Sequence, residues 1–135
     1  MQFQNLQFYP SAPSYYTLVM TDPDAGEVSE VKHWIVVNIP GNDIARGETI
    51  AEYIGPAPPN GSGLHRYVFL VYEQPDGPMQ FNEPYSDDDD FSYRPFFRVQ
   101  QFADQYNLGT PVAGNFFLAA WDESVPALRA RLGLN

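Results

Sequence analysis

Residues 15–39 read YYTLVMTDPDAGEVSEVKHWIVVNI, two apolar runs separated by an acidic segment. The runs, residues 15–20 and 33–39, are rich in β-branched and aromatic side chains, which favours β-strands. The Asp-Pro-Asp of residues 22–24 follows the first run and is typical of a turn. Both runs are apolar almost without interruption, as strands are when both faces of their sheet are covered. The stretch therefore predicts two buried strands.

Similar signals recur along the rest of the chain. Residues 66–73 (RYVFLVYE) and 115–121 (NFFLAAW) predict two more strands, and residues 2–8 predict a weaker one. Apolar side chains three and four residues apart predict a helix over residues 97–107. A second helix is predicted over residues 124–132, because it starts with a favourable N-cap serine and has a proline in its first turn.

The composition favours one globular domain over residues 1–135, since a chain of this length is typical of a single domain. Hydrophobic residues make up 44% and aromatic residues 16%, which excludes intrinsic disorder. Thirteen prolines and ten glycines indicate many loops rather than a helical bundle. The expected fold class is mainly β: a central sheet or a β-sandwich with small peripheral helices.

The charge balance and the residue types that are missing exclude several classes of function. Seventeen acidic residues against seven basic ones give a net charge of −10, and Lys32 is the only lysine, so nucleic acid is not an expected partner. The absence of cysteine excludes disulfides, thiolate nucleophiles and cysteine-ligated metals. No apolar run approaches the roughly 18 residues of a membrane span, and no signal peptide is evident. We expect a cytoplasmic protein without an integral membrane segment.

Acidic and histidine side chains gather at the ends of the predicted strands. Asp22 and Asp24 follow the first strand, His33 opens the second, and His65 precedes the third. A proline- and glycine-rich loop, residues 53–64, separates the histidines and can present backbone N–H groups to an anion. Two imidazole donors, one of them oriented by a carboxylate, can bind a phosphate or a carboxylate. The alternative is structural: Asp-Pro-Asp also forms turns, and single histidines are commonly satisfied polar residues.

Enzyme motifs are a poor match to this sequence. It contains no Gly-x-Ser-x-Gly elbow, no phosphate-binding Gly-x-x-x-x-Gly-Lys sequence and no His-Glu-x-x-His. A Ser-His-Asp triad can be composed from scattered residues in most sequences. A metal-assisted hydrolase built on Asp22, His33 and His65 stays an alternative. We expect a protein that is not an enzyme and needs no cofactor.

Four segments together carry a family resemblance. Residues 21–25 (TDPDA), 33–39 (HWIVVNI), 55–59 (GPAPP) and 63–67 (GLHRY) closely resemble the phosphatidylethanolamine-binding protein family, and the likeness extends over residues 15–128. This family includes the Raf kinase inhibitor proteins and the plant florigen relatives.

The resemblance implies a β-sandwich with flanking helices and a small anion pocket without a metal. By position the pocket residues are Asp22, Asp24, His33, Ala57, Pro58, Pro59, His65 and Tyr67. The implied ligands are phosphate, small carboxylates and phosphorylated lipid head groups such as phosphoethanolamine. The implied role is a regulatory one in signalling, with a kinase or a serine protease as a possible partner. We expect His65 to donate to a phosphate oxygen, with Asp22 fixing the tautomer of His65 or of His33.

The departures from the family pattern lead to further expectations. Gly26 replaces a proline, and only residues 26–32 connect the acidic turn to His33, so one pocket wall is expected to be shorter and the pocket wider or more exposed. Arg129 stands where some animal members have a tyrosine at the pocket mouth. The family's N-terminal strands are expected to be shortened or missing.

Overall fold

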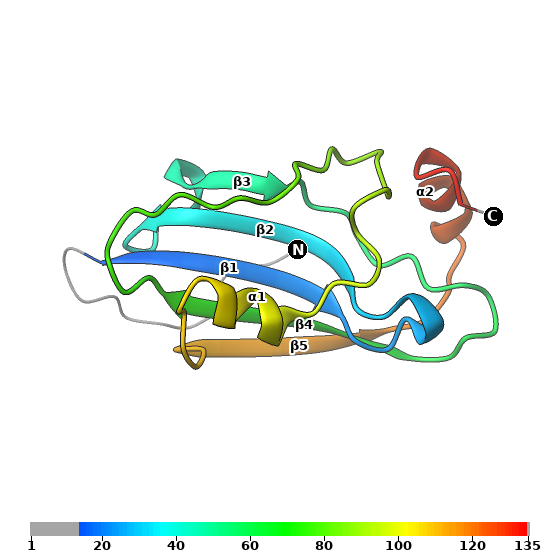
Figure 1. Ribbon diagram of the computed structural model, residues 1–135. Helices are drawn as coiled ribbons and strands as arrows, with labels where there is room; N and C mark the ends of the chain where they lie inside the picture. Colours follow the sequence, from blue (N-terminus) through cyan, green and yellow to red (C-terminus); the bar gives the residue numbers. More distant parts are fainter. Residues whose placement is uncertain (1–13, 135) are drawn as a thin grey trace.

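The computed structural model describes residues 14–134, which contain one five-stranded antiparallel sheet (Figure 1). The strands are β1 (Tyr15–Asp22), β2 (Val31–Pro40), β3 (Glu48–Ala51), β4 (His65–Glu73) and β5 (Ala113–Ala119). The α-helices are α1 (Val99–Gln105) and α2 (Val125–Arg131), and short 3-10 turns form at η2 (Gly26–Val28) and η3 (Ile44–Arg46). The expected mainly-β architecture with small peripheral helices is confirmed.

The order of strands in the sheet is β3-β2-β1-β4-β5, with β1 at its centre. The first three strands form one half of the sheet, with β2 beside β1 and β3 beside β2. Residues 52–64 then carry the chain to the other side of β1, where β4 and β5 follow. Asp22 at the end of β1 pairs with Val31 at the start of β2, and Thr21 pairs with Val68 near the start of β4. One end of the sheet therefore brings together the end of β1 and the beginnings of β2 and β4.

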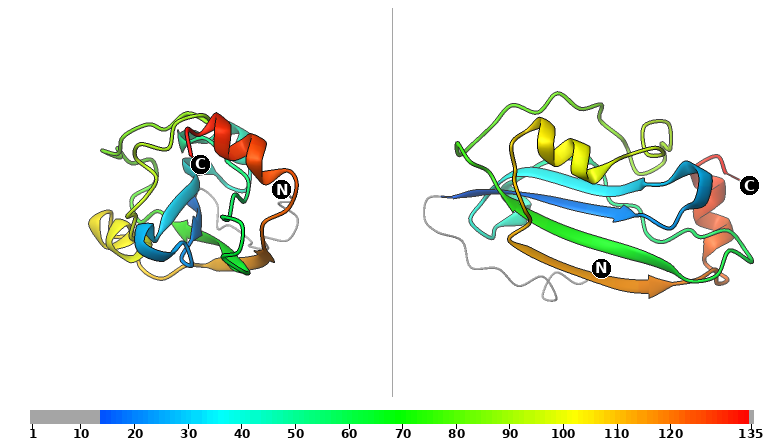
Figure 2. Two further views of the ribbon diagram at one scale, coloured as in Figure 1. Left: turned by 90° about the vertical axis from the view of Figure 1, so that its right-hand side faces the viewer. Right: turned by 60° about the horizontal axis from the view of Figure 1, so that its bottom comes forward.

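One face of the sheet is covered by α1 and by segments without regular secondary structure. Val19 and Ile35 on the sheet belong to one buried cluster with Phe102, Ala103 and Tyr106 of the α1 region. Figure 2 shows α1 lying over this face and α2 standing at the end of the sheet. The helix forms because apolar residues recur on the side that faces the sheet, which is the pattern the sequence predicted.

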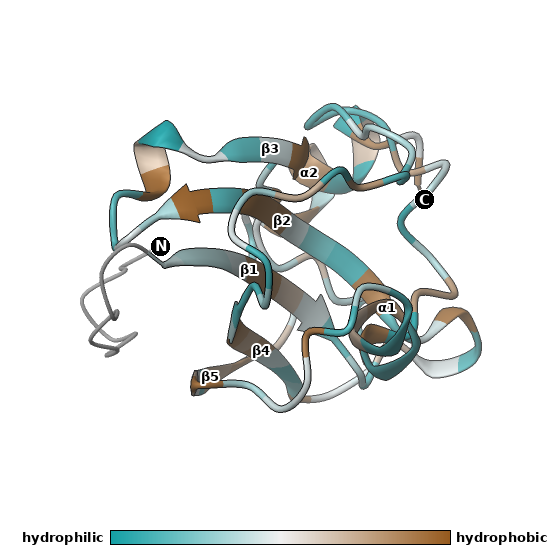
Figure 3. Cartoon of the chain, turned by 60° about the vertical axis from the view of Figure 1, so that its left-hand side comes forward, coloured by the Kyte–Doolittle hydropathy of each residue, from teal (hydrophilic) through white to brown (hydrophobic). Residues whose placement is uncertain are grey.

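The opposite face is buried as well. Leu18, Met20 and Val36 form a second cluster with Tyr67 of β4, and Phe117 of β5 packs against it. Successive side chains of a strand point to opposite faces, and every residue of β1 after the first is buried. Brown, hydrophobic stretches lie along the strands between teal and white ones (Figure 3). The expectation that the apolar runs are covered on both faces is confirmed for β1 and β2. It is wrong for β5, where Phe116 and Leu118 are exposed.

Arg94 attaches the irregular segment that follows β4 to the sheet. Its side chain is fully buried, and its guanidinium donates to the carbonyl oxygens of Glu52, Asp87 and Asp90 at 2.8, 2.7 and 2.8 Å. The Lys32 amide also donates to the Arg94 carbonyl at 2.8 Å. A buried arginine is tolerated only where acceptors replace its water, so these contacts fix the loop beside the start of β2.

The structure corrects the sequence prediction at two strands. β3 was not predicted, because this four-residue strand buries only Ile50 and Ala51. The last strand begins at Ala113 and ends at Ala119, two residues earlier at each end than predicted. The strand predicted over residues 2–8 lies outside the described residues. Between residues 14 and 134, no helix is both long and apolar enough to cross a membrane.

Candidate ligand-binding site

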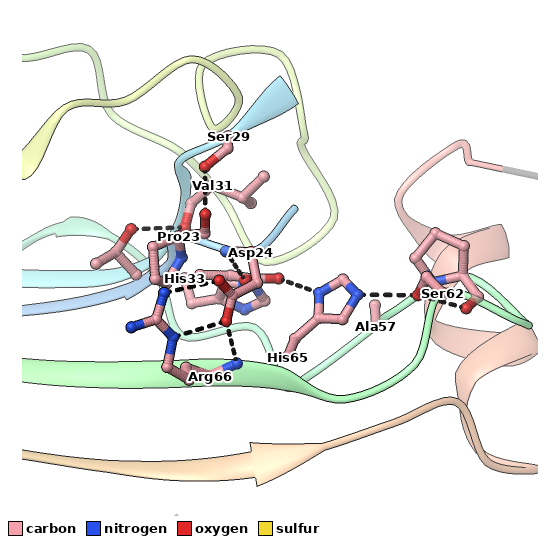
Figure 4. Close-up of polar contacts among 12 residues, drawn as sticks. Pro23, Asp24, Ser29, Val31, His33, Ala57, Ser62, His65 and Arg66 are labelled. Carbon is pink, nitrogen blue, oxygen red and sulfur yellow. Dashed lines mark hydrogen bonds and ion pairs between the residues drawn. The ribbon is translucent and has the colours of Figure 1, made fainter. Parts of the chain in front are cut away.

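A cavity of about 200 Å³ lies at the end of the sheet where β1 ends and β2 and β4 begin. Asp22 is the last residue of β1, His65 is the first of β4, and His33 is near the start of β2, so the antiparallel pairing brings all three to the same edge. Figure 4 shows His33 and His65 there. Of the predicted pocket residues, the following line the cavity: Asp22, His33, Ala57, Pro58, Pro59, His65 and Tyr67. Asp24 does not line it.

Asp22 connects the acidic turn with β4. One carboxylate oxygen, Oδ1, accepts the backbone N–H of Asp24 at 2.7 Å, which closes the turn. The other, Oδ2, lies 2.7 Å from Nδ1 of His65, and both side chains are buried. Asp22 is therefore both the turn former and the partner of an imidazole. It orients His65, which decides between the two histidines that the sequence left open.

The second imidazole nitrogen of His65 is held by Ser62. The Ser62 hydroxyl donates to the carbonyl oxygen of Pro59 at 2.7 Å and lies 2.9 Å from Nε2 of His65. Because a carboxylate only accepts, Nδ1–H of His65 donates to Oδ2 of Asp22.

His33 is a neutral imidazole. Burial lowers the pKa of His33 to about 4, although the backbone hydrogen bonds to Ile54 and Gly55 and the charge of Asp22 oppose this shift. Nδ1 lies 2.9 Å from the carbonyl oxygen of Ile54, so Nδ1 carries the proton and Nε2 is an acceptor. The ring meets Tyr67 edge to face, with the centroids 5.2 Å apart.

Tyr67 forms an aromatic wall of the cavity. Its ring stacks on Phe117 at 5.4 Å and lies nearly parallel to the His65 ring at 6.3 Å. Burial raises the pKa of the Tyr67 hydroxyl, and the Asp22 charge raises it further. A hydrogen bond with the Asp22 carboxylate also contributes to the raised pKa, so the hydroxyl stays protonated at neutral pH.

Asp24 lies beside the cavity in an ion pair. Its carboxylate accepts Nε and Nη2 of Arg66 at 2.9 and 2.8 Å, and also the Arg66 backbone N–H at 2.8 Å. The hydrogen bond from the Arg66 side chain lowers the pKa of Asp24 to about 2. This fork joins the acidic turn to β4 and leaves Asp24 directed toward Arg66.

The outer wall of the cavity is apolar apart from Arg129. Val28 of η2, Phe91, and Leu132 and Leu134 from the C-terminal region line it. Arg129 on α2 also lines it and donates from Nη1 to the carbonyl oxygen of Ala57 at 3.0 Å. The short connection at residues 26–32 thus contributes a wall of its own.

Comparison with known proteins assigns the chain to a family. Residues 5–117 match the family model described as "Phosphatidylethanolamine-binding protein". The chain belongs to this family. The resemblance read from the sequence is thereby confirmed.

Similar members of the phosphatidylethanolamine-binding protein family include one protein from Drosophila melanogaster, "Putative odorant-binding protein A5". It is 41% identical over 138 residues, which cover 98% of this chain and 65% of that protein. The chain thus spans just under two thirds of the length of this relative.

Two solved structures are also similar. The solution structure of CG7054 has a TM-score of 0.74 and 33% identity, covering 92% of this chain and 72% of that one. A carboxypeptidase Y inhibitor, solved in complex with its cognate proteinase, has a TM-score of 0.69 and 37% identity, covering 90% of this chain and 66% of that one.

Sequence reasoning missed several residues that line the cavity or support its histidines. Ser62 gave no signal, because its contact with His65 depends on how the loop folds back. The apolar wall residues Phe91, Leu132 and Leu134 are far from the motif and look like ordinary hydrophobic residues. Within residues 14–134, no three histidine or acidic side chains cluster closely enough to hold a metal ion.

Proposed function

We propose that this chain is a non-enzymatic binding protein whose cavity takes a small anion, such as phosphate, a carboxylate or the phosphorylated head group of a lipid. The observation that carries the proposal is the convergence of Asp22, His33 and His65, from three strands, on one cavity. An isolated carboxylate there would repel an anion. Here both Asp22 oxygens already accept hydrogen bonds, one from the Asp24 backbone N–H and one from His65, so the carboxylate does not present a bare oxygen to the ligand. The names of the family and of the fly relative both refer to ligand binding, which supports this role.

The proposal includes a regulatory role in the cytoplasm. A ligand in the cavity contacts η2, the proline-rich loop and α2 at once, because all three contribute to its walls. Occupancy can therefore change the surface that these segments offer to a partner, such as a kinase in a signalling pathway.

The same geometry supports a hydrolase less well. Asp22, His65 and Ser62 have the connectivity of a Ser-His-Asp triad, with contacts of 2.7 and 2.9 Å. A nucleophilic serine must give its hydroxyl proton to the imidazole. Ser62 instead donates to Pro59, and it does not line the cavity. The chain of hydrogen bonds is thus better suited to orienting His65 than to attacking a substrate.

An NMR titration tests the proposal. Inorganic phosphate and phosphoethanolamine are added to the full chain while the two imidazoles are observed; His33→Asn and His65→Gln assign them, because the chain has only two histidines. We expect saturable shifts at both rings. The side-chain amide of Gln74, at the other end of β4, serves as an internal control and should stay unchanged. A folded protein whose imidazoles do not respond to saturating anion would refute the proposal.

A second candidate function is inhibition of a serine protease, favoured by the 37% identical carboxypeptidase Y inhibitor. Peptide hydrolysis by that proteinase is measured with and without this chain. Inhibition that survives in His65→Gln, while phosphate binding is lost, would show that protein contacts act independently of the cavity. Full proteinase activity at a large excess of the chain would exclude inhibition of that enzyme.

A further inference from the structure

The donors of the two cavity histidines are already committed. His33 carries its proton on Nδ1 and gives it to Ile54, which leaves Nε2 as an acceptor. His65 uses one nitrogen toward Asp22 and the other toward Ser62. Neither ring offers a spare N–H to a ligand without breaking one of these contacts. Recognition of an anion therefore needs a donor from another part of the cavity wall.

Arg129 is positioned to be that donor. Among the described residues that line the cavity, it is the one lysine or arginine. Helix α2 presents it to the proline-rich loop, where Nη1 contacts the Ala57 carbonyl at 3.0 Å. A guanidinium has five N–H donors in a planar fork and pairs well with carboxylates and phosphates. In a chain with a net charge of −10, a local cation is what makes an anion site possible.

The remainder of the cavity suits an apolar group. Ile54, Phe91, Leu132 and Leu134 line it together with the ring of Tyr67. An apolar protein cavity of roughly 150 Å³ is able to hold benzene. The volume of about 200 Å³ here has room for one ring or a short alkyl chain. The two acyl chains of a phospholipid do not fit within it.

We propose that Arg129 is the anion-recognising residue of this cavity, and that the ligand is a small amphiphilic acid: a carboxylate or phosphate monoester that bears one aromatic or short aliphatic group. This inference rests on the proposed function, that the cavity binds a small anion. It adds the residue that supplies the positive charge and the apolar body of the ligand. Arg129 exchanges or shares its contact with Ala57 when the acid binds.

Calorimetric titrations with three probes separate the two parts of the ligand. Phenyl phosphate carries both the ring and the anion, inorganic phosphate carries only the anion, and benzyl alcohol carries the ring without the charge. Burial of one phenyl ring should strengthen binding of phenyl phosphate roughly tenfold or more over phosphate. Phenylacetate, as a carboxylate with the same ring, shows whether the site requires a phosphate.

Substitutions on one helix test the role of Arg129. Arg129→Gln should weaken phenyl phosphate binding about tenfold, because a charge-assisted hydrogen bond is lost. Benzyl alcohol binding should be unchanged. Arg131→Gln is the matched control: it removes the same charge from α2, but Arg131 contacts the Asp88 carbonyl and does not line the cavity. This control should change affinity by less than about twofold. Arg129→Lys should restore part of the affinity.

The outcomes distinguish this inference from the function on which it rests. Phenyl phosphate and phosphate binding equally well to wild type, or unchanged affinity in folded Arg129→Gln, overturns the inference but leaves an anion-binding cavity. Failure of every anion to bind the folded wild-type chain overturns both. An equal loss in Arg129→Gln and Arg131→Gln would assign the effect to the net charge of α2 and also overturn the role of Arg129.

Discussion

Both ends of the sheet carry buried polar side chains, and at one end these side chains line the cavity described above. At the far end, Gln74 joins β4 to the centre of the sheet through four hydrogen bonds. At the cavity end, Asp22, His33 and His65 occupy the corresponding strand termini. Both sets are formed by β1, β2 and β4. Their difference shows which buried polar groups hold the fold and which are available to a ligand.

The far end is held by a network centred on an amide, which we call the Gln74 network: Thr17, Asn38, Gln74, Gly77 and Met79. Asn38 bonds the Met79 backbone twice at 2.8 Å and reaches the Glu48 carboxylate at 3.4 Å. Gln74 Oε1 accepts from Thr17 Oγ1 and the Asn38 backbone N–H at 2.8 and 2.9 Å. Its Nε2 donates to Asn38 Oδ1 and the Gly77 carbonyl, both at 2.8 Å. These bonds use the full capacity of the amide, so nothing is left for a ligand.

The cavity end differs in charge and in surroundings. Asp22, His33 and His65 are ionisable and line the cavity. Burial strongly lowers the pKa of His33. Perturbed ionisable groups around a cavity are typical of functional sites. Burial of polar side chains alone therefore does not identify a binding site. A binding site is indicated where ionisable side chains also line a cavity.

The largest effect on stability is expected from Gln74→Leu. The substitution removes four hydrogen bonds and leaves Thr17 and Asn38 partly unsatisfied, so the free energy of unfolding should fall by about 4 kcal/mol. Anion binding by the folded fraction should be unchanged. Urea denaturation measures the loss, and Gln101→Leu, at an exposed position on α1, is the control. A loss below about 1 kcal/mol would show that the network is not structural.

The next largest effect is the response to acid caused by His33. Its folded pKa of about 4 lies below the ordinary 6.5, so the unfolded chain binds the proton first as the pH falls. The free energy of unfolding should therefore decrease between pH 6.5 and pH 4, by up to about 3 kcal/mol. Above pH 6.5 this contribution is constant. His33→Asn should remove that part of the slope, and an identical slope in the variant would show that His33 is not the source.

Most of the fold could be predicted from the sequence, because the central strands are continuous apolar runs. Residues 15–20, 33–39 and 66–73 all fall within observed strands. β3 could not be predicted, since Ile50 and Ala51 are its only buried residues. The attachment of the loop through Arg94 depends on main-chain carbonyls, which leave no pattern in the sequence.

The site could be predicted only in part. Asp22, His33 and His65 could be identified from the sequence, because they stand at the ends of predicted strands and within the segments that resemble the family. The partner of Asp22 was left open, since it depends on β1 ending beside the first residue of β4. Ser62 and the contact of Arg129 with Ala57 depend on loops that fold back over the sheet, so no local spacing indicates them.

A middle-sized effect on stability, together with weaker binding, is expected from Asp22→Asn. The variant keeps an acceptor for the Asp24 backbone N–H but loses the charged hydrogen bond to His65, at a cost of about 2 kcal/mol. Phosphate affinity should fall, because the imidazole is no longer oriented. Denaturation and calorimetry measure the two effects, with Asp104→Asn on α1 as the control. Should binding be lost in Gln74→Leu and retained in Asp22→Asn, the comparison between the two ends would be reversed.

The smallest effect is expected at Asp24, although it belongs to the same Asp-Pro-Asp motif as Asp22. The Arg66 side chain is 54% exposed and that of Asp24 30%, so water and salt screen their ion pair. Since the pair lowers the pKa of Asp24 to about 2, its contribution to stability is present above pH 3.8 and is lost as the pH falls toward 2. Asp24→Asn and Arg66→Gln should each cause a small loss of stability at neutral pH that shrinks further in high salt, with phosphate affinity unchanged. Denaturation at two salt concentrations and a phosphate titration check both points. A clear fall in phosphate affinity in Asp24→Asn would place this carboxylate in the binding site, as the family resemblance implied, and would extend the functional end of the sheet beyond the cavity wall.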